Sequence, residues 1–307
     1  MGGKVRALTR GWAGLTPGVS LALVEILSLP ECDMDAWNPA SFDDELRETL
    51  TCYSNLIIDY YREEQILMDE HLNSDPYESL KANRFYSEYS TLHEQIVSPQ
   101  LAARRIRVWH YTRLLDCEVT RMRSKLVSTT PASFAQRLDM LVGKNLLTRE
   151  EAEIVYSQSP LHSQQSSRAG RLWTTSVPMS ASNRGVAPLL GNWGGESAYF
   201  WLSDVAIAEK LRNIGKPRIV EIDTALRDKL NSYSVAKTVL QSWAKSLGQP
   251  ISIEGSDLSI TDCLETAKVL VVHSPGDGVY EAVADCYPVG WEQHRVSSLT
   301  IDNSLAR

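Results

Sequence analysis

Apolar side chains in the first third of the chain recur at intervals of three and four residues, the period of one face of an α-helix. The first such stretch ends near residue 71, and Asp43, Asp44 and Glu45, which follow Ser41, are typical of a helix N-terminus. Asp75-Pro76 restarts the chain, and residues 77–97 repeat the period. The pattern predicts a helical hairpin over about 43–98.

The pattern changes after Pro99, where runs of alternating or continuous apolar residues predict strands. We expect strands at 106–111, 171–175, 198–202, 218–222, 269–273, 281–286 and 296–301. We expect helices at 114–126, 133–142, 148–158, 186–190, 204–214 and 234–247. Because strands and helices do not alternate regularly, the fold class predicted is α+β rather than a doubly wound sheet.

Charge divides the chain at the same place. Residues 1–104 hold 8 basic and 17 acidic side chains (−9), whereas residues 105–307 hold 23 and 21 (+2), which sums to the net charge of −7. We therefore predict an acidic helical region at 1–104 and an α+β catalytic-type domain at 105–307. The acidic region is either a regulatory, partner-facing part or a solvated helical face.

Several classes of protein are not indicated. No apolar run approaches the ~20 residues of a membrane helix, and no secretory signal pattern is found, so we expect a cytoplasmic protein without membrane contact. The five cysteines form no CxxC pair and the six histidines no pair at metal-ligand spacing, so no metal site is expected. Phosphate-binding loops, dinucleotide fingerprints and nucleophile elbows are also missing.

Two strand ends carry polar and aromatic side chains that could contact a ligand. The first is Trp109-His110-Tyr111-Thr112, in which His110 can hydrogen-bond a ligand or be an ordinary core histidine. The second is the segment 172–176, Leu-Trp-Thr-Thr-Ser, which follows a polar loop. Because hydroxyl side chains are common at strand ends, the second segment alone is weak evidence for a ligand site.

Two glycine-rich turns deliver a carboxylate. In 192–199, Asn-Trp-Gly-Gly-Glu-Ser-Ala-Tyr, the glycine pair permits an unusual backbone before Glu196, which we place at the start of a strand. In 275–283 a Gly-Asp-Gly loop delivers Glu281 to the start of an apolar strand. Each carboxylate can stabilise positive charge in a transition state, or lie in solvent at a strand edge.

In this order the features resemble the ADP-ribosyltransferase family, with its diphtheria-toxin-like and DNA-targeting branches. His110, the segment 173–176 and Glu281 match the family's first strand, its second strand and its catalytic glutamate. The resemblance covers about residues 105–301, and departs from the pattern in having Trp173 where the His-Tyr-Glu class has tyrosine. It implies a split mixed β-sheet core and a reaction that uses NAD as substrate and no metal.

The resemblance also implies roles for single residues. Glu281 is expected to stabilise the oxocarbenium-like charge that develops when the nicotinamide–ribose bond breaks. Other side chains are expected to orient the ribose and carboxamide or to stack on the nicotinamide. The expected NAD-contacting residues are His110, Tyr111, Thr112, Trp173, Thr174, Thr175, Ser176 and Tyr199.

Seven basic residues between 104 and 125, Arg107 and Arg113 among them, flank the first strand. They either contact a nucleic acid or protein acceptor, or neutralise the acidic hairpin, which would then restrain activity. A separate inhibitory, antitoxin-like partner is a further expectation. The leading hypothesis is an ADP-ribosyltransferase, a toxin or defence effector that modifies nucleic acid or protein. The alternatives are a non-catalytic binding module on a degenerate version of the fold, and an enzyme whose key carboxylate is Glu196.

Overall fold

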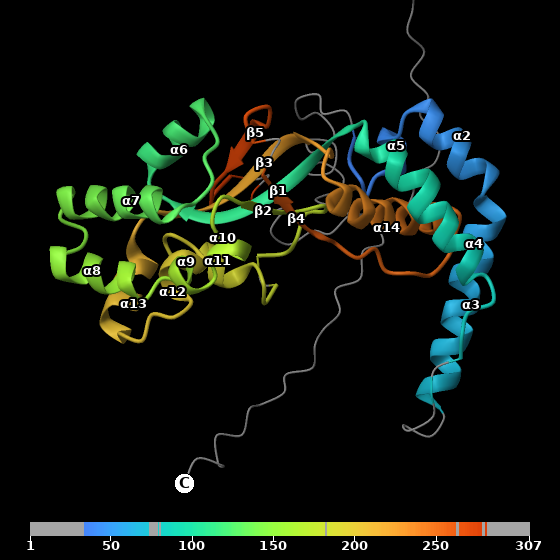
Figure 1. The fold of residues 1–307 in the computed structure, drawn as a ribbon, viewed down its shortest axis with the longest axis horizontal. Helices are drawn as coiled ribbons and strands as arrows, with labels where there is room; N and C mark the ends of the chain where they lie inside the picture. Colours follow the sequence, from blue (N-terminus) through green and yellow to red (C-terminus); the bar gives the residue numbers. More distant parts are fainter. Residues whose placement is uncertain are drawn as a thin grey trace, which may run out of the picture.

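The structure is a computed structural model that describes residues 34–73, 79, 81–181, 183–261, 264–277 and 280. The helical region lies at one end of the molecule and the sheet in the middle (Figure 1). Its elements are the 3₁₀ turn η1 (Pro39–Ser41), α2 (Asp44–Cys52), α3 (Ser54–Leu72), α4 (Tyr86–Thr91), the π-helical η2 (Leu92–Val97) and α5 (Ser98–Ala102). Asp43 caps α2 by accepting the Leu46 amide at 2.8 Å, which explains why the helix begins at the predicted acidic cluster.

Five antiparallel strands form one sheet in the order β4-β2-β1-β3-β5. They are β1 (Arg105–Leu114), β2 (Leu172–Thr175), β3 (Lys216–Ala225), β4 (Asp257–Ile260) and β5 (Lys268–His273). The α+β class and the helical N-terminal region are confirmed. The expected mixed sheet is not seen, since every pairing among the described strands is antiparallel.

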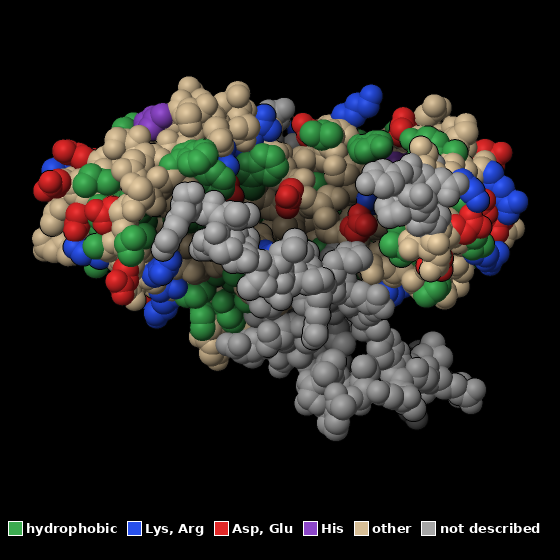
Figure 2. All heavy atoms as spheres, turned by 90° about the horizontal axis from the view of Figure 1, so that it is seen from below, with side chains coloured by type: hydrophobic (Ala, Val, Ile, Leu, Met, Phe, Trp, Pro, Cys, Tyr) green, Lys and Arg blue, Asp and Glu red, His purple; other side chains and the backbone are tan. Residues whose placement is uncertain are grey.

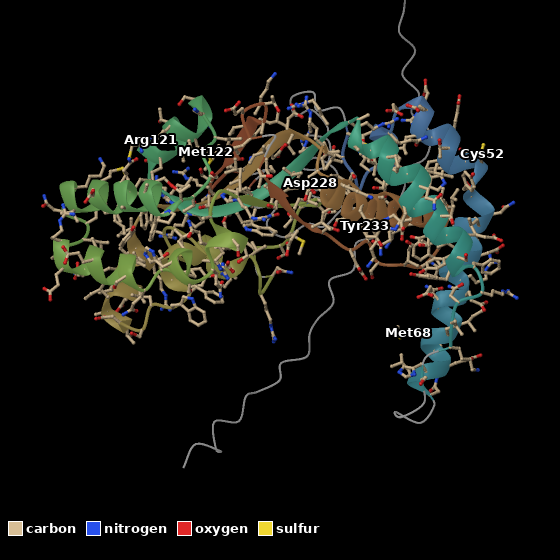
Figure 3. The ribbon with its side chains drawn as sticks, in the orientation of Figure 1. Cys52, Met68, Arg121, Met122, Asp228 and Tyr233 are labelled. Carbon is tan, nitrogen blue, oxygen red and sulfur yellow. The ribbon has the colours of Figure 1, made fainter. Side chains whose placement is uncertain are left out.

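The remaining helices lie between these strands and cover the end of the molecule opposite the helical region (Figure 1). They are α6 (Asp116–Ser124), α7 (Pro131–Gly143), α8 (Arg149–Ser157), α9 (Pro160–Ser163), α10 (Gln165–Arg168), α11 (Ala187–Gly191), α12 (Glu196–Tyr199) and α13 (Val205–Asn213). The last helix, α14 (Lys229–Ser246), lies beside the sheet and begins at Asp228, whose carboxylate accepts two backbone amides (Figure 3).

Two sequence predictions differ from the structure. The strand expected at 198–202 is wrong, because residues 196–199 form the helical turn α12 after two glycines with positive φ. The strand β4 was missed, although Asp-Leu-Ser-Ile alternates polar and apolar residues. The strands expected at 281–286 and 296–301 lie outside the described residues.

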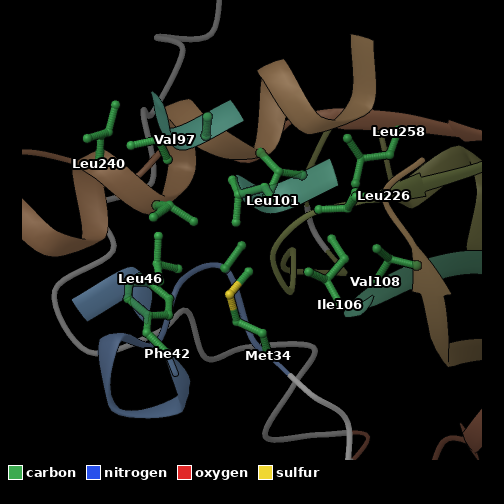
Figure 4. Packing of buried hydrophobic residues seen from close by; sticks show 14 of the residues in the cluster. Met34, Phe42, Leu46, Val97, Leu101, Ile106, Val108, Leu226, Leu240 and Leu258 are labelled. Atoms are coloured by element: carbon green, nitrogen blue, oxygen red, sulfur yellow. The ribbon is translucent and has the colours of Figure 1, made fainter. Parts of the chain in front are cut away.

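The largest hydrophobic core joins the helical region to the sheet through α14. One side of the sheet contributes Val108, Ile222 and Leu258 to this core, and the helical region contributes residues such as Leu46 and Leu101 (Figure 4). Each of these side chains is at most 1 % exposed. The Arg107 amide of β1 donates to the Met34 carbonyl at 2.9 Å, so residue 34 lies beside this strand. The helices in the described ranges are too short or too polar to cross a bilayer.

Among the described residues, the opposite side of the sheet is covered on one half only. Over β1 and β3, Trp109, Tyr111 and Ile219 are buried under α11 and the loop before it. Over β2 and β4, the side chains that alternate to the same side are partly or fully exposed; they are Trp173, Thr175, Asp257 and Ser259. We call these four residues the open half-face.

Gly215 is required where α13 turns into β3. Its φ is +70°, and a Cβ atom there would lie 2.5 Å from the Leu114 carbonyl oxygen. We expect Gly215→Ala to lower the free energy of unfolding by about 2 kcal/mol or more, because an L-residue is strained in the left-handed region and the backbone must also move. Urea unfolding measures this. Gly143→Ala, at the end of α7 with no atom within 4 Å of the new Cβ, is the control and should be neutral or stabilising.

Candidate functional site

His110 lies where β1 meets β2. The two strands are in register at the pair Trp109↔Thr175, and next to this pair the His110 imidazole contacts β2, with Nδ1 2.8 Å from the Trp173 carbonyl oxygen. Nδ1 therefore carries the proton and donates it to the carbonyl. Desolvation lowers the pKa of His110, the hydrogen bond to Trp173 partly offsets this, and the charge of Arg137 lowers the pKa further. His110 is therefore a neutral residue at pH 7 that fixes the position of Trp173.

The open half-face begins with Trp173, whose side chain is 46 % exposed, one strand away from His110. Thr175 and Asp257 lie opposite each other on β2 and β4, on the same side of the sheet as Trp173. The Thr175 hydroxyl donates to the Val177 carbonyl at 2.7 Å. Desolvation raises the pKa of Asp257, and the negative charge of Glu196 raises it further, so a second carboxylate lies near this face.

Glu196 occupies the first turn of α12, not the start of a strand as the sequence predicted. The glycine pair is necessary for this turn: Gly194 and Gly195 have φ values of +79° and +58°, and a Cβ on Gly194 would lie 2.8 Å from the Ala198 Cβ. The Glu196 carboxylate forms an ion pair with Arg168 of α10. Tyr199 is half-buried, and its pKa is raised to about 12, first by desolvation and then by Glu196.

Trp193, which precedes the glycine pair, has a structural role. It is fully buried, its Nε1 donates to the Glu118 carboxylate at 2.8 Å, and the Arg137 guanidinium lies 4.6 Å from its ring centroid. Arg137 in turn pairs with Glu118 at 2.8 Å. This cluster anchors the turn that carries Glu196.

Four residues expected to contact NAD are engaged inside the protein. The Met179 amide donates to the Tyr111 hydroxyl, and the Thr174 hydroxyl donates to the Leu258 carbonyl at 3.4 Å. Ser176 is fully buried, lies 3.3 Å from the Thr238 hydroxyl and accepts the Ser256 amide at 2.9 Å. Thr112 is buried opposite Arg218. The structure thus brings His110, Trp173 and Thr175 together on β1 and β2, whereas Glu196 lies on α12 and is paired with Arg168. Glu281 lies outside the described residues.

Three of the seven basic residues that flank β1 form ion pairs; they are Arg104, Arg105 and Arg107. Arg104 binds Asp43 at 2.6 Å and Glu45 at 2.9 Å, which links the acidic helical region to the sheet. Arg113 donates to the Ile214 carbonyl at 2.8 Å, and desolvation lowers its pKa. The exposed bases of this flank are on α6, where Arg121 points away from the sheet (Figure 3). Neutralisation of the hairpin therefore accounts for Arg104 better than an acceptor does.

Arg107 belongs to a buried ionic cluster that the sequence did not indicate. Glu221 of β3 is 0 % exposed and binds Arg107 Nη1 at 2.8 Å and His273 Nε2 at 2.7 Å. Asp35 completes the cluster, with its Oδ1 3.2 Å from Arg107 Nε. One feature of the sequence could have revealed the cluster: a single glutamate stands inside the apolar run Ile-Val-Glu-Ile, and a glutamate buried in a strand needs buried partners.

Burial raises the pKa of Asp35 from 3.8 to about 6, while Arg107 lowers it and Glu221 raises it to smaller extents. Because the folded pKa is raised, the fold favours the protonated form, and stability falls as the pH rises from about 4 to about 6. The linkage amounts to about 2–3 kcal/mol.

We expect Asp35→Asn to remove this part of the pH dependence, because the amide keeps the shape without the charge. Urea unfolding at pH 4.5 and pH 7.5 measures it: relative to the natural chain, the variant should gain more stability at pH 7.5 than at pH 4.5. Asp69→Asn, at an exposed position on α3, is the control. Equal stability differences at both pH values would contradict the raised pKa.

Metal-ligating side chains do not cluster in the described ranges, where no group of three or more His, Cys, Asp or Glu residues is placed to hold an ion. Cys52 and Cys117 are exposed free thiols, and Cys52 lies on the outer side of α2 (Figure 3).

No family model, curated protein or solved structure matches the chain.

Proposed function

We propose that the protein is an NAD-consuming ADP-ribosyltransferase whose reaction takes place on the open half-face. The observation that carries the proposal is the placement of Trp173, Thr175 and Asp257 on one side of neighbouring strands, within electrostatic reach of Glu196. The short pairing of β1 with β2, at the pair Trp109↔Thr175 beside His110, supports the finer fold proposal, a split sheet like that of the ADP-ribosyltransferases.

The chemistry requires a negative charge beside the ribose. Breaking the nicotinamide–ribose bond develops positive charge on the anomeric carbon and ring oxygen, and a carboxylate fixed nearby stabilises it. Of the two described carboxylates near the open half-face, Glu196 is a better candidate for this role than Asp257. The glycine turn and the buried Trp193 cluster fix the backbone of Glu196. Glu281 remains the alternative that the sequence pattern predicts.

The remaining groups suit the nicotinamide and the phosphates. The exposed indole of Trp173 offers a flat surface for the nicotinamide ring, and the neutral His110 holds its backbone. Arg168 can bind the pyrophosphate, which would draw its guanidinium away from Glu196 and leave that carboxylate free to face the ribose.

A non-catalytic binding module on the same fold is the second candidate. It is favoured by the hydroxyls of Thr174 and Ser176, which are used in internal hydrogen bonds, and by the ion pair that occupies Glu196. Such a module would bind NAD or its analogues without releasing nicotinamide.

One experiment separates the two. The full chain is incubated with NAD labelled in the nicotinamide ring, with and without protein and nucleic-acid acceptors, and free nicotinamide is quantified by chromatography. Calorimetry with NAD is run in parallel. Release supports the transferase; NAD binding without release supports the module; the absence of both contradicts the proposed site.

A further inference from the structure

Three exposed basic side chains near the end of α6 have no ion pair among the described residues; they are Arg121, Arg123 and Lys125. The segment 119–136, which contains them, holds no acidic residue. Apolar surface adjoins these cations, because Met122 is only partly buried and Val127 is 57 % exposed. We call these five residues the basic corner. Cations in the last turn of a helix suit its C-terminus, but that interaction leaves their charge without a counter-ion.

The end of α3 has the opposite charge. Its last turns project beyond α4 and α14 (Figure 1). Residues 63–70 hold four acidic side chains and no basic one. Ile66 and Met68 are each 48 % exposed, and Leu72 is 74 % exposed. Acidic, basic and hydrophobic side chains lie next to one another at this end of the molecule in Figure 2. We call residues 63–72 the acidic tip.

Neighbouring bases offset the charge of the acidic tip only in part. Glu63 binds Arg84 at 3.5 Å and Glu70 binds Lys81 at 2.8 Å, and in both pairs the basic side chain is about seven-tenths exposed. Ion pairs that lie in solvent to this extent are weak. Asp69 is exposed and forms no ion pair within the described ranges. The tip therefore keeps an excess of negative charge.

We infer that the acidic tip of one molecule docks on the basic corner of a second copy of the same chain. The two surfaces carry opposite charge, and each exposes apolar side chains beside its charges. They lie at opposite ends of the molecule, as the positions of Met68 and Arg121 in Figure 3 show, so they cannot meet within one chain. Every other copy carries both complements, and this makes a second copy the partner.

The contact is heterologous, because the tip of one copy meets the corner of another and each added molecule leaves one surface of each kind free. Association therefore continues past the dimer. Exposed charges mainly orient such a contact, and burial of Met68 and Leu72 against Met122 and Val127 provides much of the affinity. Because the contact is small, it is weak and sensitive to salt. It includes no residue of the open half-face, so the inference does not rest on the proposed function.

Sedimentation velocity of the full chain tests the inference at protein concentrations of about 5 to 300 µM and a salt concentration of about 25 mM. The weight-average sedimentation coefficient should rise with protein concentration and exceed the value for a dimer. At about 0.5 M salt, association should weaken about tenfold, because the charges are then screened within a few ångströms.

Charge reversal identifies the two surfaces. Arg121→Glu combined with Arg123→Glu should weaken association about tenfold or more, and so should Asp69→Lys combined with Glu70→Lys, because like charges then face each other. An equimolar mixture of the two double variants should associate again. In the mixture the unchanged tip of the first variant meets the unchanged corner of the second, and the two reversed surfaces also have opposite charge.

The chain offers matched controls for both kinds of substitution. Arg227→Glu combined with Lys229→Glu reverses two exposed cations at the start of α14 and should leave association unchanged. Leu72→Ser tests the tip without altering charge and should weaken association several-fold. Leu230→Ser, at a side chain that is 73 % exposed against 74 % for Leu72, should have no effect.

Several results would overturn the inference. A sedimentation coefficient that does not change with concentration would exclude association, and a plateau at the dimer would indicate a closed, symmetric contact instead. Failure of the mixture to associate, or equal losses for Leu72→Ser and Leu230→Ser, would show that the tip and the corner do not meet.

Discussion

Glu196→Gln is expected to slow nicotinamide release by about two to three orders of magnitude, because removing one preorganised electrostatic contact to a developing charge has an effect of this size. The amide keeps the shape of the side chain, and Glu196 lies on a surface turn whose carboxylate is about two-fifths exposed, so little change in stability is expected. The measurement is kcat for release at saturating NAD, with the melting temperature recorded for every variant.

The matched control is Glu48→Gln, an exposed glutamate on α2 in the helical region, which should leave kcat unchanged. Glu281→Gln is the decisive comparison. If Glu281→Gln abolishes release and Glu196→Gln does not, the key carboxylate is the one that the sequence pattern predicts, and the open half-face contributes binding only. If both abolish release, the two carboxylates act on the same substrate.

Glu221→Ala is expected to have the largest effect on stability, lowering the free energy of unfolding by about 3–5 kcal/mol. The substitution removes the ion pair to Arg107 Nη1 and the partner of His273 Nε2, in a part of the sheet where Glu221 itself is 0 % exposed. Because a buried charge that loses one of its partners does not regain its hydration, the loss exceeds that of the contacts alone.

Urea unfolding of Glu221→Ala beside Glu209→Ala, an exposed position on α13, tests this. Glu221→Gln separates charge from shape: it can still bond Arg107 and His273, and we expect a loss between those of the other two variants. A loss below about 1 kcal/mol for Glu221→Ala would mean that water reaches the cluster in solution and that its charges are not desolvated.

Elements with a strong local signal were predictable from the sequence. Helix α8 was predicted to within one residue of its start, where Thr148 and Glu151 form a capping box. β1 and β3 were predicted because their apolar runs are buried from both sides. The turn at 194–199 was misread as a strand opening, since positive φ at two glycines redirects the chain into α12 and hydrophobicity does not report φ.

The candidate site was predictable only in part. His110, Trp173 and Glu196 were singled out from residue type and turn chemistry; the structure places His110 against Trp173 of β2, and Glu196 on α12, where its charge acts on Asp257. Asp257 was missed because its strand is four residues long, and Asp35, Arg107, Glu221 and His273 were not recognised as partners because they come from four distant segments. Side chains that meet only through tertiary pairing leave no local pattern.

The contact between Met34 and β1 has a consequence for association between copies of the chain. Beyond the pair Trp109↔Thr175 the edge of β1 toward Arg105 has no β2 partner, and the Met34 carbonyl occupies the Arg107 amide there. A chain shortened past Ala36 would lose this contact beside the apolar Ile106 and Val108 and free the Arg107 amide to pair with another strand. We therefore expect the contact of Met34 with Arg107 to disfavour pairing of this part of β1 with a second molecule.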